Sequence, residues 1–526
     1  MAEVKGYPVF KGTFVDHSGI GDTGLDVRIV NGFRDPINTV TKRPALSSNI
    51  SEIGTPGTYG TYNMYGIYKI FGFPSGSPEE FLPTLVVSAS GNNYAIHRIL
   101  FEPSTTGMDA LVSEIRSTSK TNVEQDIKYY GIRHEQGVNS TGDIVSFLCF
   151  SGIILEYNYT TQLFTDITPV EVPNPVRDIA YVNRRLLAID STDDRVYYSA
   201  TGDPSDFSIG GGGGSFQAES QVDTIRRIVS QGNDLYIFGP KSVDLYYNSG
   251  DATFPFERYN GSEVKTGLIN SQALVNVDGT FYFYNDAGQI VRLRGTDYEI
   301  VSNKINVIIS RFLGEGNTPT EFNRMTDFQI DGRHFIMLTL TRVQNIDTPL
   351  GTDSAADGLS LVYDIGLDDW YVWTDDSSIQ RLGWYSSVFA PLNNVSLVCD
   401  SSLQKVRYLS FQDADYSSNK ETLVVTSANI DLGSHKRKSA HMMTARVKGT
   451  VGPTVQYREG PVSSPIATGT NPFYTLVSGE TIDDEGTFMR VPRLGQYRVR
   501  QYRFTHSDNS AFSIGDVTEE VEVLGS

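Results

Sequence analysis

Short runs of apolar and aromatic residues, each interrupted by a polar turn, recur along the first 421 residues. Examples are LVVSASGNNYAIHRILF from Leu85 and FYFYNDAGQIVRLRG from Phe281. Alternating apolar and polar positions, bounded by Gly, Asn, Asp and Ser, are typical of paired antiparallel strands. The pattern therefore predicts an all-β protein. Seven such units begin 39 to 62 residues apart, at Leu85, Phe147, Leu186, Leu235, Phe281, Phe335 and Val395.

The spacing of these units indicates a repeat architecture. A four-stranded propeller blade occupies roughly 40 to 50 residues, and flanking runs such as RDIAYV (177–182) and IRRIV (225–229) can supply the other two strands of a blade. A blade has two apolar faces, which it buries by stacking against its neighbours around an axis. We therefore predict a β-propeller over residues 1–421, with about seven units and six to eight blades compatible with the spacing. The N-terminal segment is a candidate to complete one blade.

Two stretches interrupt the spacing and are expected to be insertions on the ring surface, near residues 102–142 and 345–358. The first contains MDALVSEIRSTSK, which is compatible with a helix, and the second is rich in Gly, Asp and Ser. From about Thr422 the hairpin repeat ends, although alternation continues in TARVKGTVGPTVQYREG. Residues 422–526 are therefore expected to form a separate, β-sandwich-like domain.

The charge of the chain is unevenly distributed. Its 526 residues carry a formal charge of −19, and residues 422–526 hold 11 Lys plus Arg against 11 Asp plus Glu, so the whole excess of acid lies in residues 1–421. Affinity for the nucleic-acid backbone comes from cations that neutralise phosphates, so this balance argues against simple DNA binding. The 49 Gly, 29 Tyr and 27 Phe agree with a turn-rich β-fold and exclude coiled coil or wholesale disorder.

Cysteine usage and the ends of the chain add little chemistry. Cys149 and Cys399 each lie in an apolar run and are expected to be buried, reduced thiols without a disulfide framework. The N-terminus lacks the apolar core of a signal peptide, and no run of about 18 apolar residues occurs. We expect a soluble protein made in a cytoplasm, with no membrane insertion by this chain.

A search for catalytic patterns finds none that outweighs a structural interpretation. The sialidase box, HExxH, GxSxG and the P-loop are absent. Glycosidases place two carboxylates ~5 to 9.5 Å apart across a cleft, which neighbouring acids on a turn rarely do. The histidines lack metal-ligand spacing, and burial is the better interpretation of the tryptophans. We therefore predict no catalytic residue, metal or cofactor. The candidates that were considered and set aside are Asp193/Asp194, Asp368/Asp369, Asp375/Asp376, Asp483/Asp484, His435, His441, Trp370, Trp373 and Trp384.

Basic residues gather in the last hundred residues. HKRKSAH (His435 to His441) is the densest cationic run, and arginines crowd the final strands, where Arg498 and Arg500 are expected on one strand face beside Tyr502. They either dock an acidic partner or DNA phosphates, or they form a solvated hairpin and an outer strand face. The candidate docking residues are Lys436, Arg437, Lys438, Arg498, Arg500 and Arg503.

One block of sequence contains motifs that are more informative about function than the composition is. AESQVDTIRRIVSQGNDLYIFGPKSVDLYYNSGDATFPF (218–256) combines a Glu-Ser-Gln-x-Asp-x-Ile motif, an aromatic-Gly turn and an acid-aromatic pair. KTGLINSQALV, VSNKINVIISRF, LSLVYDIGLDDWYVW and RLGQYRVRQYRF follow it in order. In these motifs the chain resembles the packaged-DNA stabilisation proteins of short-tailed bacteriophages, which are the tail nozzle or hub proteins that complete the head.

This resemblance implies a non-enzymatic virion protein of the phage tail. It implies a homo-oligomeric ring, a hexamer by analogy, that lies below the portal and its adaptor ring, retains packaged DNA and forms the channel for ejection. The implied partners are further copies of the chain, the portal–adaptor ring, tail fibre, spike or needle proteins, and double-stranded DNA that passes without sequence-specific binding. An acidic lumen would repel phosphates and keep sliding friction low. The alternative is a tail-associated propeller that binds or cleaves glycans, which requires facing carboxylates and a stacked Trp in a cleft.

Overall fold

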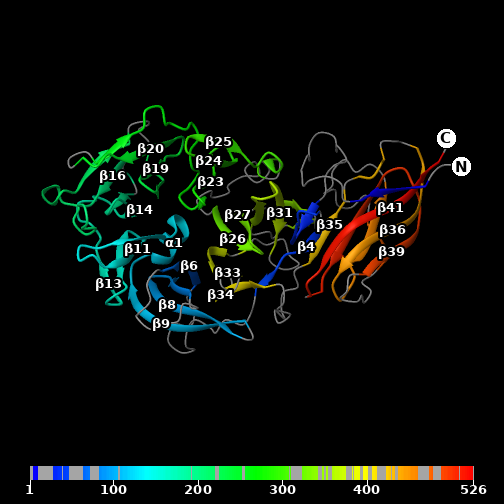
Figure 1. Cartoon of the computed structure of the whole chain (residues 1–526), viewed down its shortest axis with the longest axis horizontal. Helices are drawn as coiled ribbons and strands as arrows, with labels where there is room; N and C mark the ends of the chain where they lie inside the picture. Colours follow the sequence, from blue (N-terminus) through cyan, green and yellow to red (C-terminus); the bar gives the residue numbers. More distant parts are fainter. Residues whose placement is uncertain are drawn as a thin grey trace.

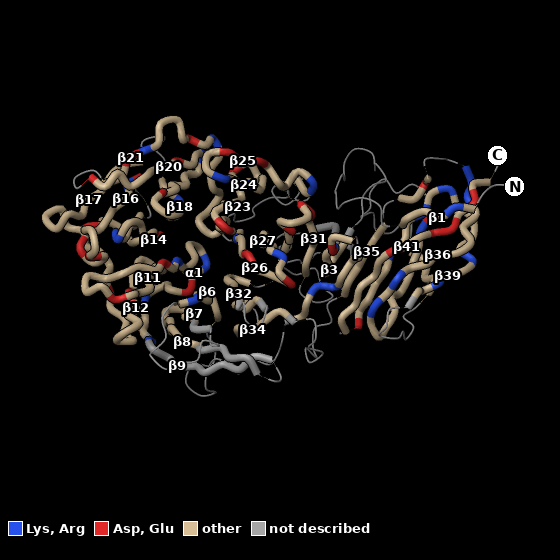
Figure 2. The backbone as a smooth tube through the Cα atoms, viewed as in Figure 1, with Lys and Arg blue, Asp and Glu red and all other residues tan. Residues whose placement is uncertain are grey.

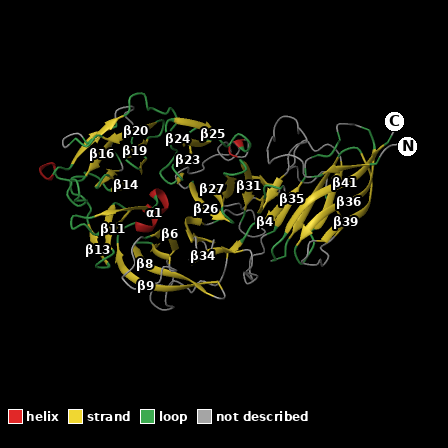
Figure 3. Cartoon of the chain, viewed as in Figure 1, coloured by secondary structure: helices red, strands yellow, loops and turns green. Residues whose placement is uncertain are grey.

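The structure is a computed structural model of the chain. It describes residues 4–9, 28–37, 39–46, 63–70, 82–104, 107–190, 192, 194–218, 224–251, 255–306, 309, 323–341, 346–348, 351–353, 358–374, 382, 384–390, 395–400, 405–410, 422–427, 429–432, 436–459, 473–477, 487–508 and 510–524. Within these residues a ring of antiparallel sheets lies beside a second body of longer strands that contains both chain ends (Figures 1 and 3).

The ring is a β-propeller with seven four-stranded blades in the described part of the chain. The first three are β6 (Asn63–Lys69), β7 (Leu82–Ser90), β8 (Asn93–Ser104) and β9 (Gly107–Ser119); β10 (Arg133–Val138), β11 (Ile144–Phe150), β12 (Ile153–Asn158) and β13 (Leu163–Asp166); and β14 (Val176–Val182), β15 (Arg185–Asp190), β16 (Arg195–Tyr198) and β17 (Gly214–Gln217). The next two are β18 (Arg227–Gln231), β19 (Asp234–Phe238), β20 (Val243–Asn248) and β21 (Phe256–Arg258); and β22 (Leu274–Val277), β23 (Thr280–Tyr284), β24 (Ile290–Arg294) and β25 (Asp297–Ile300). The last two are β26 (Arg324–Ile330), β27 (Arg333–Thr341), β30 (Gly358–Asp364) and β31 (Asp369–Trp373); and β32 (Trp384–Ala390), β33 (Val395–Asp400), β34 (Lys405–Ser410) and β5 (Ala45–Leu46).

The seven strand–turn–strand units predicted from the sequence are the middle two strands of the seven blades. Their apolar side chains pack between neighbouring sheets. Phe238 of blade four, for example, lies edge-on to Phe281 and Phe283 of blade five, with ring centroids 5.6 and 5.5 Å apart. The prediction of an all-β propeller is therefore confirmed.

The N-terminal segment closes the ring. Blade seven takes its outer strand, β5, from residues 45–46, which pair antiparallel with β34 through Leu409↔Leu46 and Ser410↔Ala45. The first and last blades are thereby joined by a strand that precedes blade one in sequence. The N-terminal segment, a candidate from the sequence to complete a blade, thus completes blade seven through the pairing of β5 with β34.

The second body is a β-sandwich of two sheets that share strands with the N-terminal segment. One sheet has the order β3-β4-β41-β36-β39 with β1 beside β41, and the other runs from β31 of blade six through β2, β35, β40 and β37 to β38. These strands are β1 (Lys5–Pro8), β2 (Arg28–Val30), β3 (Gly32–Arg34), β4 (Val40–Lys42), β35 (Leu423–Thr426), β36 (Lys438–Lys448), β37 (Thr454–Glu459), β38 (Tyr474–Val477), β39 (Thr487–Tyr497), β40 (Arg500–His506) and β41 (Ser513–Val523).

The strand pairing corrects the boundaries expected from the sequence. β1 and β4 pair with β41, and β2 pairs with β35 on one side and lies parallel to β31 of blade six on the other, so the sandwich is continuous with the propeller. One core also spans both bodies, because Phe328, Trp373 and Trp384 of the propeller share a cluster with Phe504 of the sandwich. The C-terminal region is therefore not a self-contained domain.

The predicted insertion near residues 102–142 is also corrected. Residues 107–119 form β9, which pairs with β8 from Asn93↔Ser119 to Ser104↔Gly107, and α1 (Val123–Tyr130) and β10 follow. Continuous pairing with β8 outweighs the local helical tendency, because an isolated helix of this length is marginal in water. The stretch near 345–358 does depart from the blade pattern, since β28 (Ile346–Thr348) and β29 (Gly351–Asp353) form a small extra hairpin there.

Candidate functional site

The candidate docking residues divide into buried and exposed cations. Lys438 is 0% exposed, and its Nζ donates hydrogen bonds to the carbonyl oxygens of Lys436 (3.0 Å) and Arg498 (2.6 Å). Arg500 is 1% exposed and donates to Glu459 Oε1 at 2.6 Å. Its guanidinium is also packed against aromatic rings of the sandwich. Lys438 and Arg500 therefore act inside the sandwich and are not surface charges that a partner could meet.

The remaining candidates lie nearer the surface. Arg503 is half-buried with its guanidinium 3.9 Å from the ring centroid of Phe473, and burial lowers its pKa. Lys436, Arg437 and Arg498 are exposed. Because Lys438 bonds to the backbone of both Lys436 and Arg498, these three exposed cations lie at one end of β36 and β39, which we call the basic edge. His435 lies outside the described residues.

The expected pairing of Arg498 with Arg500 on one strand face is wrong. β39 ends at Tyr497 and β40 begins at Arg500, so Arg498 lies in the turn between them. A residue in a reversing turn does not follow the alternation of a strand. Sequence alternation alone could not locate this reversal inside QYRVRQYR.

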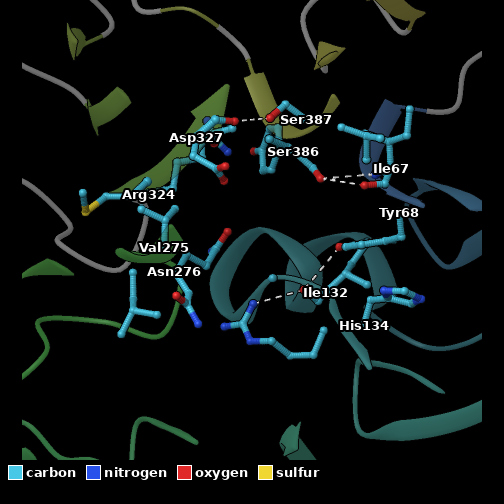
Figure 4. A pocket seen from close by; sticks show the side chains of 18 of the residues that line it. Ile67, Tyr68, Ile132, His134, Val275, Asn276, Arg324, Asp327, Ser386 and Ser387 are labelled. Atoms are coloured by element: carbon cyan, nitrogen blue, oxygen red, sulfur yellow. Dashed lines mark hydrogen bonds between the residues drawn. The ribbon is translucent and has the colours of Figure 1, made fainter. Parts of the chain in front are cut away.

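The propeller axis holds a second, unpredicted site. A cavity of about 540 Å³ is lined by the first strands of six blades, β6, β10, β18, β22, β26 and β32. Figure 4 shows the labelled residues entering this space from different sides, with Tyr68 and His134 facing Arg324 and Asp327 across it. A volume of this size suits a small molecule, since ligand pockets usually measure ~300 to 1,000 Å³.

Helix α1 crosses one end of this axis. It follows blade one in sequence, yet its C-terminal carbonyls accept hydrogen bonds from the chain entering blade five: Gln272 Nε2 donates to Lys128 O (2.5 Å) and Ser271 Oγ to Tyr130 O (3.2 Å). Blade five lies on the other side of the ring from the start of blade two. The helix therefore braces opposite blades and occupies the middle of the propeller (Figure 1).

Buried charges surround the axis below the helix. Asp178 of β14 is 0% exposed and accepts hydrogen bonds from the backbone N–H groups of Ile179 (3.0 Å) and Ile228 (2.9 Å). Its two carboxylate oxygens also lie 3.0 Å from Arg133 Nε and 3.9 Å from Arg227 Nε. One carboxylate thus serves two guanidinium groups from different blades, and these contacts fix blades two, three and four against one another.

Two further titratable groups in this region have shifted pKa values. Burial, with a smaller contribution from the charge of Asp178, raises the pKa of Glu135 to about 8. Burial lowers the pKa of His134 to about 4. Its Nε2 lies 2.8 Å from the hydroxyl of Ser146, and its ring stacks on Tyr68. At neutral pH both side chains are therefore uncharged, and the cavity wall they form is polar without being acidic.

The tryptophans and the pair Asp368/Asp369, which were weighed for catalysis, are buried or hydrogen-bonded within the fold. Trp370, Trp373 and Trp384 are all 0% exposed, so their expected burial is confirmed and they cannot stack on a sugar. Asp368 accepts a hydrogen bond from the hydroxyl of Tyr363 (2.8 Å), and Asp369 is buried. Cys149 and Cys399 are buried free thiols, as expected. The pairs Asp375/Asp376 and Asp483/Asp484, together with Asp193, lie outside the described residues.

Two searches of the described residues are negative. They contain no group of three or more His, Cys, Asp or Glu side chains placed to hold a metal ion. No helix among them combines the length and apolar character needed to cross a membrane.

The solved structures that align with the chain belong to distant proteins. A chain from the crystal structure of a mitotic checkpoint complex is 12% identical, with 72% of this chain and 98% of that chain aligned at a TM-score of 0.35. A hydrazine synthase chain from Kuenenia stuttgartiensis is 9% identical, with 56% and 76% aligned at a TM-score of 0.33. Neither alignment supports a functional argument. No curated protein has a significant sequence match to the chain.

The family comparison is more specific. Residues 134–338 match the family described as bacteriophage P22 Gp10, beta-propeller. The matched segment begins in β10 of blade two and ends in β27 of blade six, so it spans the part of the ring that holds the block 218–256. The resemblance found in the sequence is thereby confirmed over residues 134–338, which are similar to the β-propeller of the family described as bacteriophage P22 Gp10.

Proposed function

We propose that this chain forms the tail nozzle or hub ring of a short-tailed bacteriophage, below the portal and its adaptor, where it retains packaged DNA and provides the channel for ejection. The observation that carries the proposal is the match of residues 134–338 to the P22 Gp10 propeller family, a family of phage structural proteins with a role in DNA stabilisation. This family match agrees with a structural, non-enzymatic role of the chain in the virion tail.

The small space at the propeller axis restricts how such a channel can be built. In the described part of the chain, α1 lies in the middle of the propeller and the cavity beside it measures only about 540 Å³, which is too small for a DNA duplex. The channel must therefore lie between copies of the chain arranged in a ring, with a hexamer as the stoichiometry implied by the family. Acidic residues are distributed over several blades (Figure 2), so propeller faces turned toward the channel would repel phosphates and let DNA slide.

Electron microscopy of the purified chain, alone and on particles that lack it, tests this proposal. We expect closed rings with propellers around a central lumen, and attachment of these rings to the portal–adaptor end of the particle. Particles that lack the chain should lose DNA, and added protein should restore retention. A chain that stays monomeric, leaves DNA retention unchanged and binds a polysaccharide would instead support the glycan-binding alternative. The buried tryptophans do not favour that alternative.

A further inference from the structure

Arg324 has an unusual position at the propeller axis. It is the first residue of β26, lines the central cavity and is 4% exposed. Its guanidinium lies over the ring of Tyr385, 3.4 Å from the centroid. Its Nε has no hydrogen-bond partner, and within the described part of the chain no carboxylate forms an ion pair with it. A buried charge without a counter-charge is costly, and an arginine cannot relieve the cost by losing its proton.

The neighbouring charges do not compensate Arg324. Arg133 and Arg227 share the single carboxylate of Asp178 on the other side of the axis. The other acid of this wall, Glu135, has its pKa raised to about 8 by burial and by Asp178, so it is largely uncharged at neutral pH. Asp327, at the cavity rim, lies 3.0 Å from Nε2 of His334. The centre of a strongly acidic chain is thus locally positive.

We propose that the central cavity binds a small oxyanion, a phosphate or a carboxylate, through the guanidinium of Arg324. The cation–π contact with Tyr385 fixes the plane of the guanidinium and offsets part of its desolvation, while its remaining N–H groups are free to donate a paired hydrogen bond to an oxyanion. Asn276 on β22 also lines this space; its Oδ1 accepts a hydrogen bond from Gly279 N (3.1 Å), which leaves its Nδ2 as the donor for an anion. An anion bound there would link blades five, six and seven and stabilise the closed ring.

The consequence is a ligand-dependent stability that can be measured on the intact chain. Ligand that binds only the folded state stabilises it by RT ln(1 + [L]/Kd), so above Kd the unfolding temperature rises with the logarithm of the ligand concentration. We expect sodium phosphate, sodium acetate or both to raise the unfolding temperature with a logarithmic dependence on anion concentration, relative to sodium chloride at matched ionic strength. Calorimetric titration with each anion then separates a phosphate site from a carboxylate site. No saturable heat and no stabilisation by either anion would overturn the proposal.

Substitutions of Arg324 locate the effect. Arg324→Gln should weaken binding of the active anion by at least about tenfold, because the charge-assisted hydrogen bonds are lost. Arg324→Lys keeps the positive charge but lacks the planar guanidinium that can donate two parallel hydrogen bonds, so it should bind the anion with intermediate affinity. This variant tests the proposal if the Gln variant does not fold. Arg294→Gln, on the exposed end of β24, is the matched control and should respond as the unaltered chain does. An equal anion response in the Gln or Lys variant and the unaltered chain would contradict the assignment to Arg324.

Discussion

At the scale of single residues, Asn31 joins the propeller to the sandwich. It is 0% exposed with a positive φ of 55°, its Nδ2 donates to Thr374 Oγ1 (2.9 Å), and its Oδ1 accepts from Thr374 N (2.8 Å) and Arg43 Nε (3.1 Å). The side chain therefore satisfies buried donors from the sixth blade and the N-terminal segment at once. Asparagine is also one of the few residues that tolerates this left-handed conformation.

We expect Asn31→Ala to lower the free energy of unfolding by roughly 2 to 4 kcal/mol, because it leaves buried donors unpaired and adds left-handed strain. Asn31→Gly removes the same hydrogen bonds without the strain, so it should be the less destabilising of the two variants. Chemical denaturation of both variants measures the difference. Equal stability of Asn31→Ala and the unaltered chain would show that the junction does not depend on this side chain.

His506 gives the sandwich a defined response to pH. It is 2% exposed, its ring stacks on Phe512 with centroids 4.1 Å apart, and burial, reinforced by the charge of Lys42, lowers its pKa to about 4 while Asp508 opposes the shift. The unfolded chain takes up this proton near pH 6.5, before the folded chain does, so stability falls as pH falls from about 6.5 to about 4. The loss attributable to His506 amounts to roughly 3 kcal/mol at ~1.4 kcal/mol per pKa unit.

Unfolding measured between pH 7 and pH 4 should therefore show a shallower decline for His506→Gln than for the unaltered chain. His134, whose pKa is also about 4, serves as an internal comparison because His134→Gln should remove its own share of the slope. If neither substitution changes the slope between pH 6.5 and 4, other groups control the acid response.

At the scale of elements, the blade hairpins were predictable and their partners were not. The middle strands of each blade are buried on both faces and carry long apolar runs with a polar turn, as in Leu235 to Asn248, so a local pattern identifies them. β9 and the N-terminal strands carry weaker patterns, and their partners lie far away in the sequence or compete with a helical tendency. Local periodicity does not contain that information.

The same limit applies to the sites. Lys438 and Arg500 looked like surface cations because basic residues usually are, and only the packing of two sheets buries them. Arg324 meets Tyr385 only after the ring places blades six and seven side by side. An arginine at the first position of the strand RMTDFQI was the one signal in the sequence, and it does not distinguish a buried arginine from a strand end in solvent.

Closure of the ring by β5 can be tested with a disulfide. Ala45 and Ser410 are directly opposed on antiparallel strands, where Cα atoms lie ~4.5 to 5.5 Å apart, within the range that a disulfide spans. We expect Ala45→Cys with Ser410→Cys to oxidise and to stabilise the folded chain by roughly 2 to 4 kcal/mol. Cys149 and Cys399 are buried and should not interfere.

The matched control moves one cysteine by a single residue. Ala45→Cys with Leu409→Cys places the two side chains on opposite faces of the sheet, so it should oxidise slowly or not at all. Thiol titration and unfolding temperatures, with and without reductant, compare the two pairs. Equal oxidation of both pairs would mean that β5 is not held in the register Ser410↔Ala45.

At the scale of the whole molecule, the basic edge is the part of the sandwich best placed for electrostatic docking. Lys436, Arg437 and Arg498 are exposed and adjacent, whereas the propeller is acidic, so an acidic surface of a neighbouring copy or ring would be attracted to this edge and repelled elsewhere. Exposed charges of this kind mainly affect association rate and salt sensitivity, with each pair contributing only ~0 to 1 kcal/mol.

Changing Lys436, Arg437 and Arg498 together to Gln should therefore slow attachment to particles that lack the chain and flatten the dependence of attachment on salt, without changing the unfolding temperature. Lys438→Gln is the opposite control: it removes a buried cation that holds the carbonyls of Lys436 and Arg498, so it should lower the unfolding temperature. Attachment rates measured across a salt series would contradict the docking role if the triple variant kept both the rate and the salt slope of the unaltered chain.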